Sequence, residues 1–342
     1  MTGRAFRLRS RPAGRPTADH LELVEEPVPA PGPGEALVRT LLISLDPASR
    51  LWMSDIRGYR PPVPVGAVMD GIAVGQVTAS RREDLREGAL VRARLGWREH
   101  CLLGAGDRAE VLPEPLSAPL PAYLGVLGHT GLTAYVGLEI GRPAPGETLV
   151  VSAAAGAVGS VAGQLATARG ARAVGIAGGP AKCRHVVDDL GFAACVDRHG
   201  PDWRGELAAA TPDGVDVDFE NAGGELMDAV LMRLNVGARV VLCGMISQYD
   251  RSSGAAGGWQ GQRNIHQLLM RRATMRGFIV SDHPERFAAG REELERLLRD
   301  GRLRHVETVV DGFEQLPAAL HRLFSGESTG KVLVRVAEAA AP

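Results

Sequence analysis

A glycine-rich turn between an apolar run and a helical pattern is the feature that most constrains this fold. The stretch VVSAAAGAVGSVAGQLA, residues 150–166, joins a buried strand to a helix through the small residues Ala153–Gly159. Small side chains let the backbone turn tightly and let a pyrophosphate approach the N–H groups at the helix start. Because a strand and a helix flank the turn, we predict a dinucleotide site rather than a purely structural turn. Gly163 is expected to serve helix–sheet packing. The expected cofactor contacts here are Ala155, Gly156, Ala157 and Val158.

The same strand, glycine turn and helix pattern repeats from about residue 121 to 300, in ARAVGIAGG, VDVDFENAGG and ARVVLCGMI. Apolar strands that alternate with helices predict parallel βαβ units. Residues 1–120 carry short β-like runs broken by proline and glycine clusters, which predicts a mostly antiparallel domain. We therefore expect an α/β protein with two domains. A β-rich domain spans 1–120 and is completed by 303–342, and a doubly wound parallel sheet spans 121–302.

The end of the second strand indicates which dinucleotide is bound. NAD-specific folds place an acid there to bind the ribose 2′-hydroxyl, whereas this strand ends GIAGG without one. Glycines such as Gly178 leave room for a 2′-phosphate, and Lys182, one of two lysines in the chain, supplies positive charge. The alternative is that Lys182 is a solvated charge on a helix face. We expect NADP as the cofactor.

Charge and composition narrow the classes of partner. The 39 basic and 40 acidic residues give no net basic field for nucleic acid or for an anionic membrane. No apolar run reaches the ~18 residues of a membrane span, and the first residues lack the apolar core of an export signal. The four cysteines are scattered, so reduced thiols are expected rather than disulfides or a structural zinc. We expect a cytoplasmic protein with a small-molecule partner and neither nucleic acid nor membrane.

Several motifs together resemble one enzyme family. SAAAGAVGSVAGQLA, GIAGGPAKC, CGMISQYD, GFIVSD, LGHTGLTAYVGL and ISLDPASRLWM are similar to those of the zinc-independent prostaglandin reductases and alkenal/one double-bond reductases, within the medium-chain dehydrogenases/reductases. The match runs from about residue 40 to Val336. The resemblance implies a GroES-like β domain, a Rossmann domain, and homodimers. It also implies NADPH-dependent reduction of the C=C bond of α,β-unsaturated ketones or aldehydes.

The resemblance also implies positions for the cofactor site. The glycine loop, Gly178 and Lys182 match family cofactor positions and agree with the inference from the residues themselves. Arg198 replaces a family tyrosine and would add charge on the 2′-phosphate side, and Ser328 replaces a family asparagine. The further cofactor positions that the resemblance implies are Thr133, Asn221, Cys243, Gly244, Ile246, Ser247, Phe278, Ile279 and Val280.

Tyr249 is the candidate for proton chemistry. Hydride addition to the β carbon of an enone leaves an enolate, and a phenol aimed at that oxygen stabilises the developing charge or supplies the proton. The ribose 2′-hydroxyl of the nicotinamide half is another possible donor. The alternative for Tyr249 is an aromatic wall of the pocket.

His129 is the second candidate, since LGHTGLTAY replaces the family LGMPGLTAY. It is expected either to be a polar pocket residue that titrates near neutral pH or to be an ordinary loop histidine. His129 and Asp46 fall near positions where zinc-dependent relatives carry metal ligands, but the third position carries no matching ligand and the structural-zinc cysteines are absent. We expect no metal.

Three functions remain open on the sequence. The leading one is an NADPH-dependent enone or enal reductase. The second is a quinone reductase or a reductase with a specialised substrate, which would suit Ala48 where the family carries a tyrosine. The third is a dinucleotide-binding protein without turnover, because a fold does not fix a function.

Overall fold

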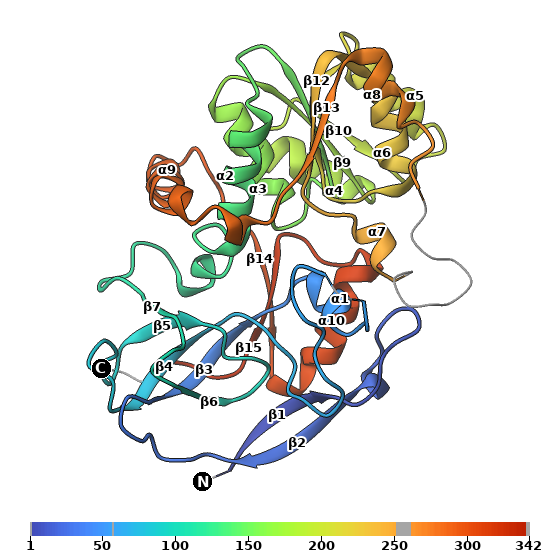
Figure 1. Cartoon of the computed structure of the whole chain (residues 1–342). Helices are drawn as coiled ribbons and strands as arrows, with labels where there is room; N and C mark the ends of the chain where they lie inside the picture. Colours follow the sequence, from blue (N-terminus) through green and yellow to red (C-terminus); the bar gives the residue numbers. More distant parts are fainter. Residues whose placement is uncertain (1, 57, 251–260, 340–342) are drawn as a thin grey trace. The chain divides into compact units, whose positions relative to one another are not determined.

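The computed structural model describes residues 2–56, 58–250 and 261–339 and divides into two units (Figure 1). Unit 1 contains the chain up to Leu124, Asp250, and the chain from Glu307 onward. Unit 2 contains Gly125–Tyr249 and the described residues up to Val306. The sequence predicted domain boundaries at 120/121 and 302/303.

Unit 2 is built on a six-stranded sheet in which every adjacent pair of strands is parallel. The strand order is β10-β9-β8-β11-β12-β13, so the direction of winding reverses between β8 and β11. Doubly wound sheets bind ligands at the carboxyl ends of the strands at this reversal. The strands are β8 (Thr148–Ser152), β9 (Arg172–Ala177), β10 (Ala194–Asp197), β11 (Val215–Glu220), β12 (Leu234–Leu242) and β13 (Thr274–Gly277).

Helices cover both faces of this sheet (Figure 1). On one face, α2 (His129–Gly141) and α3 (Gly159–Ala168) pack together, and a Cβ on Gly137 would lie 2.4 Å from the ring of Phe219. Glycine at this position therefore lets α2 approach β11 closely. The other face carries α5 (Trp203–Ala210), α6 (Gly224–Leu231) and α8 (His266–Arg271) over an apolar core. The remaining elements are α4 (Pro180–Arg184), π-helix η3 (His185–Asp189), α7 (Ile246–Tyr249), 3₁₀-helices η4 (Val280–Asp282) and η5 (Pro284–Arg286), and α9 (Phe287–Arg299).

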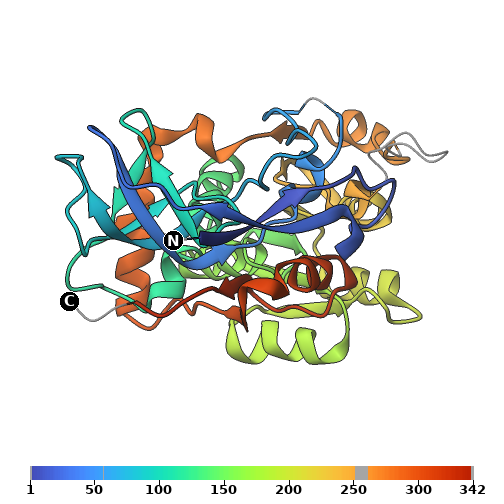
Figure 2. The same cartoon turned by 90° about the horizontal axis from the view of Figure 1, so that it is seen from below.

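Unit 1 is a mostly antiparallel β structure. Its larger sheet has the order β14-β15-β3-β4-β5-β7, with β6 also paired to β3, and β1 and β2 form a separate two-stranded ribbon (Figure 2). The strands are β1 (Thr2–Leu8), β2 (Leu21–Pro27), β3 (Ala36–Ser44), β4 (Ala73–Ser80), β5 (Leu90–Ala93), β6 (His100–Leu103), β7 (Ala109–Val111), β14 (Glu307–Asp311) and β15 (Lys331–Arg335). The helices are η1 (Ala18–His20), α1 (Ala48–Trp52), η2 (Leu120–Tyr123), η6 (Phe313–Gln315) and α10 (Leu316–Ser325).

An aromatic cluster fixes the core of unit 1. The ring of Phe6 lies edge-on to Trp97 at 6.5 Å and tilted against Phe313 at 5.3 Å. Phe313 comes from the far end of the chain, and β15 from the same end pairs antiparallel with β3. Unit 1 therefore needs both ends of the chain. The α/β fold class predicted from the sequence, with a β-rich unit beside a doubly wound parallel sheet, is confirmed. Among the described residues, no helix combines the length and apolarity required to span a bilayer.

Candidate functional site

The glycine turn after β8 leads into α3 at the carboxyl edge of the unit 2 sheet. Ala153 adopts a left-handed backbone with φ of 52°, and its carbonyl accepts the N–H of Gly156 at 2.9 Å. A Cβ at Gly159 would lie 2.5 Å from that same carbonyl oxygen. The turn is therefore tight enough to require small residues, as a pyrophosphate cradle does.

Gly163 lies one turn into α3, where a side chain would meet Phe192. A Cβ at this position would lie 1.8 Å from the ring of Phe192. The glycine therefore allows α3 to pack against Phe192, which lies in the loop between η3 and β10, whereas the sequence predicted a packing role against the sheet.

The ends of β9 and β10 bring two cations together. Gly179 has φ of 92°, and its N–H donates to the Asp197 carboxylate at 2.7 Å, which holds the turn after β9 against β10. A Cβ at Gly178 would lie 3.1 Å from the Arg198 guanidinium. Burial, and then the nearby charge of Arg198, lower the pKa of Lys182. A phosphate dianion beside Lys182 and Arg198 would relieve this repulsion, so these residues fit a 2′-phosphate.

A hydrogen-bond network that the sequence analysis missed joins the end of β8 to the end of β11. The Ser152 hydroxyl donates to Glu220 Oε1 at 2.5 Å and accepts the N–H groups of Asn221 and Ala222 at 2.7 and 3.1 Å. Asn221 Nδ2 donates to the Ser152 carbonyl oxygen at 2.8 Å. Glu220 Oε1 also accepts the N–H groups of Ala222 and Gly223. The network therefore lies at the winding reversal of the sheet.

Two carboxyl groups of β11 are fully buried. Burial, together with the neighbouring Glu220, raises the pKa of Asp218 well above its ordinary value, and neither Asp218 oxygen has a hydrogen-bond partner within the described part of the chain. Burial also raises the pKa of Glu220, although its hydrogen bonds from Ser152 and from backbone N–H groups oppose the shift. Asp218 pairs in register with Val150 and Val240, so it lies in the apolar core beneath α5 and α6.

The segment after β12 carries Tyr249. The N–H groups of Ile246 and Ser247 donate to the carbonyl oxygens of Asn221 and Ala222 at 3.1 and 3.0 Å, which joins this segment to the turn after β11. The Tyr249 phenol oxygen accepts the N–H of Met245 at 3.3 Å and lies over Gly244, where a Cβ would approach it to 3.3 Å. The phenol is therefore folded back over the carboxyl end of β12. Burial and the nearby Glu220 raise the pKa of the Cys243 thiol to about 12, which keeps it protonated.

Helix α2 and the segment after β13 pack together on one face of the sheet. Phe278 follows β13 and approaches α2, since a Cβ at Gly137 would lie 3.1 Å from its ring. Ile279 and the buried Val280 follow, and α2 packs against η4, which starts at Val280. His129, the first residue of α2, is exposed, and its carbonyl accepts the Thr133 hydroxyl at 2.7 Å.

Two residues that the sequence singles out, the predicted cofactor contact Ser328 and the metal-ligand position Asp46, belong to unit 1. Ser328 lies between α10 and β15, where its hydroxyl donates to the Arg322 carbonyl at 3.5 Å. Asp46 follows β3 and pairs with Lys331 of β15, whose ammonium group donates to Asp46 Oδ1 at 2.5 Å and to the Leu45 carbonyl at 2.8 Å. The remaining predicted site residues all belong to unit 2.

Comparisons with known proteins agree with this geometry. Two family models match, one described as the N-terminal domain of oxidoreductase over residues 4–111 and one as zinc-binding dehydrogenase over residues 157–296. The NADPH-dependent curcumin reductase of Escherichia coli (strain K12) is 39% identical over 98% of this chain and 97% of its own length. The 2-alkenal reductase (NADP(+)-dependent) of Nicotiana tabacum is 35% identical over 89% of this chain and 88% of its own length. The crystal structure of CurA in complex with NADPH from Vibrio vulnificus superposes with a TM-score of 0.91 at 40% identity, over 98% of this chain and 99% of that chain.

The chain belongs to the zinc-independent prostaglandin and alkenal reductase family. This confirms the family resemblance seen in the sequence. Within residues 2–56, 58–250 and 261–339, no group of three or more His, Cys, Asp or Glu side chains is arranged to hold a metal ion. Asp46, which aligns near a metal ligand of the zinc-dependent relatives, is instead paired with Lys331 in this reductase.

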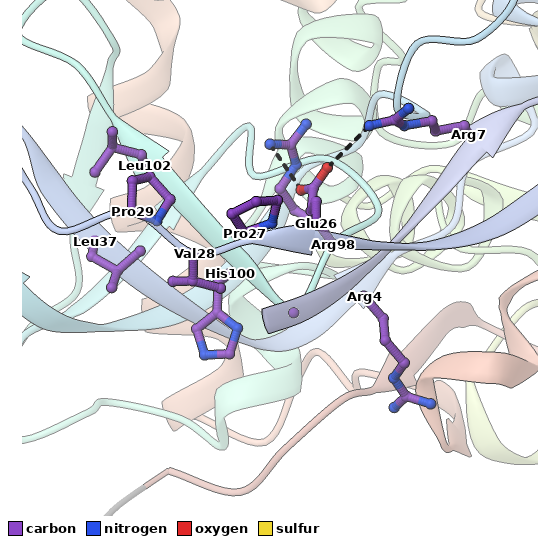
Figure 3. A pocket seen from close by; sticks show the side chains of 11 residues that line it. Arg4, Arg7, Glu26, Pro27, Val28, Pro29, Leu37, Arg98, His100 and Leu102 are labelled. Carbon is purple, nitrogen blue, oxygen red and sulfur yellow. Dashed lines mark ion pairs between the residues drawn. The ribbon is translucent and has the colours of Figure 1, made fainter. Parts of the chain in front are cut away.

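A separate cleft of about 440 Å³ lies in unit 1 of this family member (Figure 3). It contains none of the predicted site residues. Its charged groups are largely paired, since Glu26 lies 3.7 Å from Arg7 and 3.4 Å from Arg98, while Val28, Leu37 and Leu102 form an apolar wall. Glu26 is thus shared by two arginines, and the lining of the cleft includes none of the residues that the sequence singles out for a cofactor or substrate.

Proposed function

We propose that this family member reduces the C=C bond of α,β-unsaturated ketones and aldehydes with NADPH. The observation that carries the proposal is the placement of Lys182 and Arg198 beside Gly178, on the same sheet edge as the glycine turn after β8. The names of the relatives, an NADPH-dependent curcumin reductase and an NADP-dependent 2-alkenal reductase, support both the cofactor and the substrate class.

Different segments of unit 2 would bind different parts of the cofactor. The turn Ala155–Val158 would hold the pyrophosphate through backbone N–H groups, and Lys182 and Arg198 would hold the 2′-phosphate. The nicotinamide half would contact residues that follow β11, β12 and β13: Asn221, Cys243, Gly244, Ile246, Ser247 and Phe278–Val280. Thr133 of α2 lies on the same face as Phe278. We assign Ser328 of unit 1 a polar contact with the cofactor on the family resemblance alone.

Tyr249 would handle the charge that the reaction creates. A bound NADPH would supply the hydride for the β carbon of an enone, which would leave negative charge on the carbonyl oxygen of the substrate as an enolate. The phenol oxygen accepts the Met245 N–H at the carboxyl end of β12, and we assign this phenol as the donor to the enolate oxygen. Stabilisation of that oxygen lowers the barrier to hydride transfer.

His129 is the second polar group that we assign to the substrate. It is exposed at the first residue of α2, and the Thr133 hydroxyl holds the backbone of that turn through the His129 carbonyl. A neutral imidazole there would donate a hydrogen bond to a substrate carbonyl or relay a proton. An unchanged rate in His129→Ala would leave it as an ordinary surface histidine.

The sheet edge supports a homodimer. β13 ends the sheet, and among the described residues it has no strand partner on its outer side. Helix α8 directly precedes β13 and exposes Leu269 and Met270 at 79% and 64%. Pairing of β13 with β13 of a second copy would cover both the open strand edge and these two apolar side chains. Light scattering after size exclusion would test the dimer, with Leu269→Lys expected to shift the mass toward the monomer.

We place the reaction in the cytoplasm. All four cysteines are unpaired thiols, which suits a reducing compartment. Localisation of a tagged chain in its own cells would test this, and export to an oxidising compartment would contradict it.

The test of the proposed function is the loss of NADPH absorbance at 340 nm. The purified protein is offered NADPH or NADH with a 2-alkenal, an acyclic enone, a cyclic enone and a quinone. Turnover of the enal or enones with NADPH supports the proposal, and turnover of the quinone alone favours a quinone reductase. Tight NADPH binding without turnover of any of them would favour a specialised substrate or a non-catalytic role.

A further inference from the structure

The end of β8 and the end of β11 meet where the winding of the sheet reverses, and Ser152 and Glu220 lie there. Both side chains are fully buried. Ser152 comes immediately before the glycine turn, and Glu220 comes immediately before Asn221. The pair therefore connects the turn that the proposed function assigns to the pyrophosphate with the turn that it assigns to the nicotinamide half.

The contacts of Ser152 fix the turn after β11 at three points. Its hydroxyl accepts the N–H groups of Asn221 and Ala222 while it donates its own hydrogen to Glu220. Glu220 Oε1 in turn accepts the N–H groups of Ala222 and Gly223. The Ser152 hydroxyl and Glu220 Oε1 thus hold the backbone of this turn, whereas Glu220 Oε2 has no hydrogen-bond partner among the described residues.

The carbonyl of Ser152 also sets the orientation of the Asn221 amide. Asn221 Nδ2 donates to that carbonyl at 2.8 Å, so the amide nitrogen points back into the protein. The amide oxygen is then the atom that Asn221 presents as an acceptor. The hydrogen-bond donors of a nicotinamide half, its carboxamide NH₂ and ribose hydroxyls, match an acceptor.

We propose that Ser152 and Glu220 are positioning residues that hold Asn221 with its amide oxygen toward the cofactor. This inference rests on the proposed function, because it assigns the cofactor to this edge. Neither residue touches the cofactor in this scheme. They act by fixing the distance between the glycine turn and the turn after β11.

The experiment measures the dissociation constant of NADPH by fluorescence and amide hydrogen exchange in the cofactor-free protein. Ser152→Ala should raise the dissociation constant about tenfold or more, because several buried hydrogen bonds are lost together. It should also speed exchange at Ala222 and Gly223. Ser152→Thr keeps the hydroxyl, and Glu220→Gln keeps the Oε1 acceptor. The dissociation constant of NADPH in each variant should therefore stay within about threefold of the wild-type value.

Thr211→Val is the matched control. Thr211 is a buried hydroxyl of unit 2 that precedes the opposite end of β11, where it donates to the Leu207 carbonyl at 2.7 Å and accepts Arg233 Nε at 3.2 Å. Its loss should lower the unfolding midpoint without changing NADPH affinity. If Ser152→Ala lowers the unfolding midpoint but leaves the dissociation constant of NADPH unchanged, as expected for Thr211→Val, the positioning role is overturned.

Two further arms keep the test decisive. If Ser152→Ala does not fold, Asn221→Asp places an oxygen against the Ser152 carbonyl, and binding equal to the wild type would overturn the inferred orientation. If the wild type itself does not bind NADPH, the proposed function fails. The exchange arm then still decides whether Ser152 orders the turn, and unchanged exchange at Ala222 and Gly223 overturns the inference.

Discussion

Lys331 and Asp46 form an ion pair inside unit 1, and their sequence positions are 285 residues apart. The Lys331 side chain is 3% exposed, and its ammonium group also donates to the Leu45 carbonyl. Ser44 donates to the other Asp46 oxygen at 2.7 Å. The pair ties β15 to the end of β3, and both Asp46 oxygens are engaged with protein groups.

Removal of one member of this pair should be costly. Lys331→Met leaves a poorly solvated carboxylate, and we expect the free energy of unfolding to fall by about 3–5 kcal/mol. Urea denaturation measures it. Asp46→Leu combined with Lys331→Met removes both charges and should recover part of the loss. A loss below about 0.5 kcal/mol in the single variant would contradict a structural role.

Lys182 should determine the choice between the two cofactors. Lys182→Ala removes one of two cations beside the turn after β9, so we expect the dissociation constant of NADPH to rise about 10- to 100-fold. NADH lacks the 2′-phosphate and should change little. Arg184→Ala, on the same helix with an exposed side chain, is the matched control. Equal weakening of NADPH and NADH by Lys182→Ala would refute the 2′-phosphate assignment.

Tyr249→Phe removes the phenol proton and keeps the ring. We expect kcat for enone reduction to fall by about 10- to 1000-fold, with NADPH affinity nearly unchanged. Steady-state kinetics with a saturating enone measures this. Tyr123→Phe is the control, since the Tyr123 phenol is engaged with Ser117 in unit 1. Unchanged turnover in Tyr249→Phe would reduce Tyr249 to a wall of the pocket.

The buried carboxyl of Asp218 should make unit 2 less stable as the pH rises. Its folded pKa is raised, so the folded state keeps a proton that the unfolded state has lost above its ordinary value of about 3.9. Stability is then fully present below that value and falls by up to about 1.4 kcal/mol per pH unit until the folded pKa is passed. Asp218→Asn cannot titrate, so its unfolding midpoint should fall less between pH 5 and 9. Parallel profiles for the two proteins would show that Asp218 does not carry this dependence.

Much of the fold was predictable because its signals are local. The glycine turn and the alternation of apolar strands with helices are read within about 30 residues, and they predict a doubly wound sheet and its binding edge. The family resemblance was likewise carried by short motifs and is confirmed. The individual site residues, His129 and Tyr249 among them, remain predictions that the experiments above test.

The parts that the sequence analysis missed depend on distant partners. VDVDFE alternates like a half-exposed strand, yet β11 lies between β8 and β12 with both faces covered, so Asp218 and Glu220 are buried. The sequence does contain a signal for this burial, because both faces of a central strand in a parallel sheet are covered, and its carboxylates are then shielded from solvent. The pairing of Asp46 with Lys331 had no local signal, since it depends on β15 lying beside β3.

The place of β15 in the sheet also sets the order in which the two units are completed during synthesis. Every described segment of unit 2 lies between Gly125 and Val306, whereas β15 is inserted between β3 and β14 in unit 1. On the ribosome, the parallel sheet is translated in full before unit 1 receives this strand. Until Lys331–Arg335 emerges, the end of β3 at Leu42–Ser44 lacks its partner strand, so the nascent chain carries a fully translated unit 2 and an incomplete unit 1.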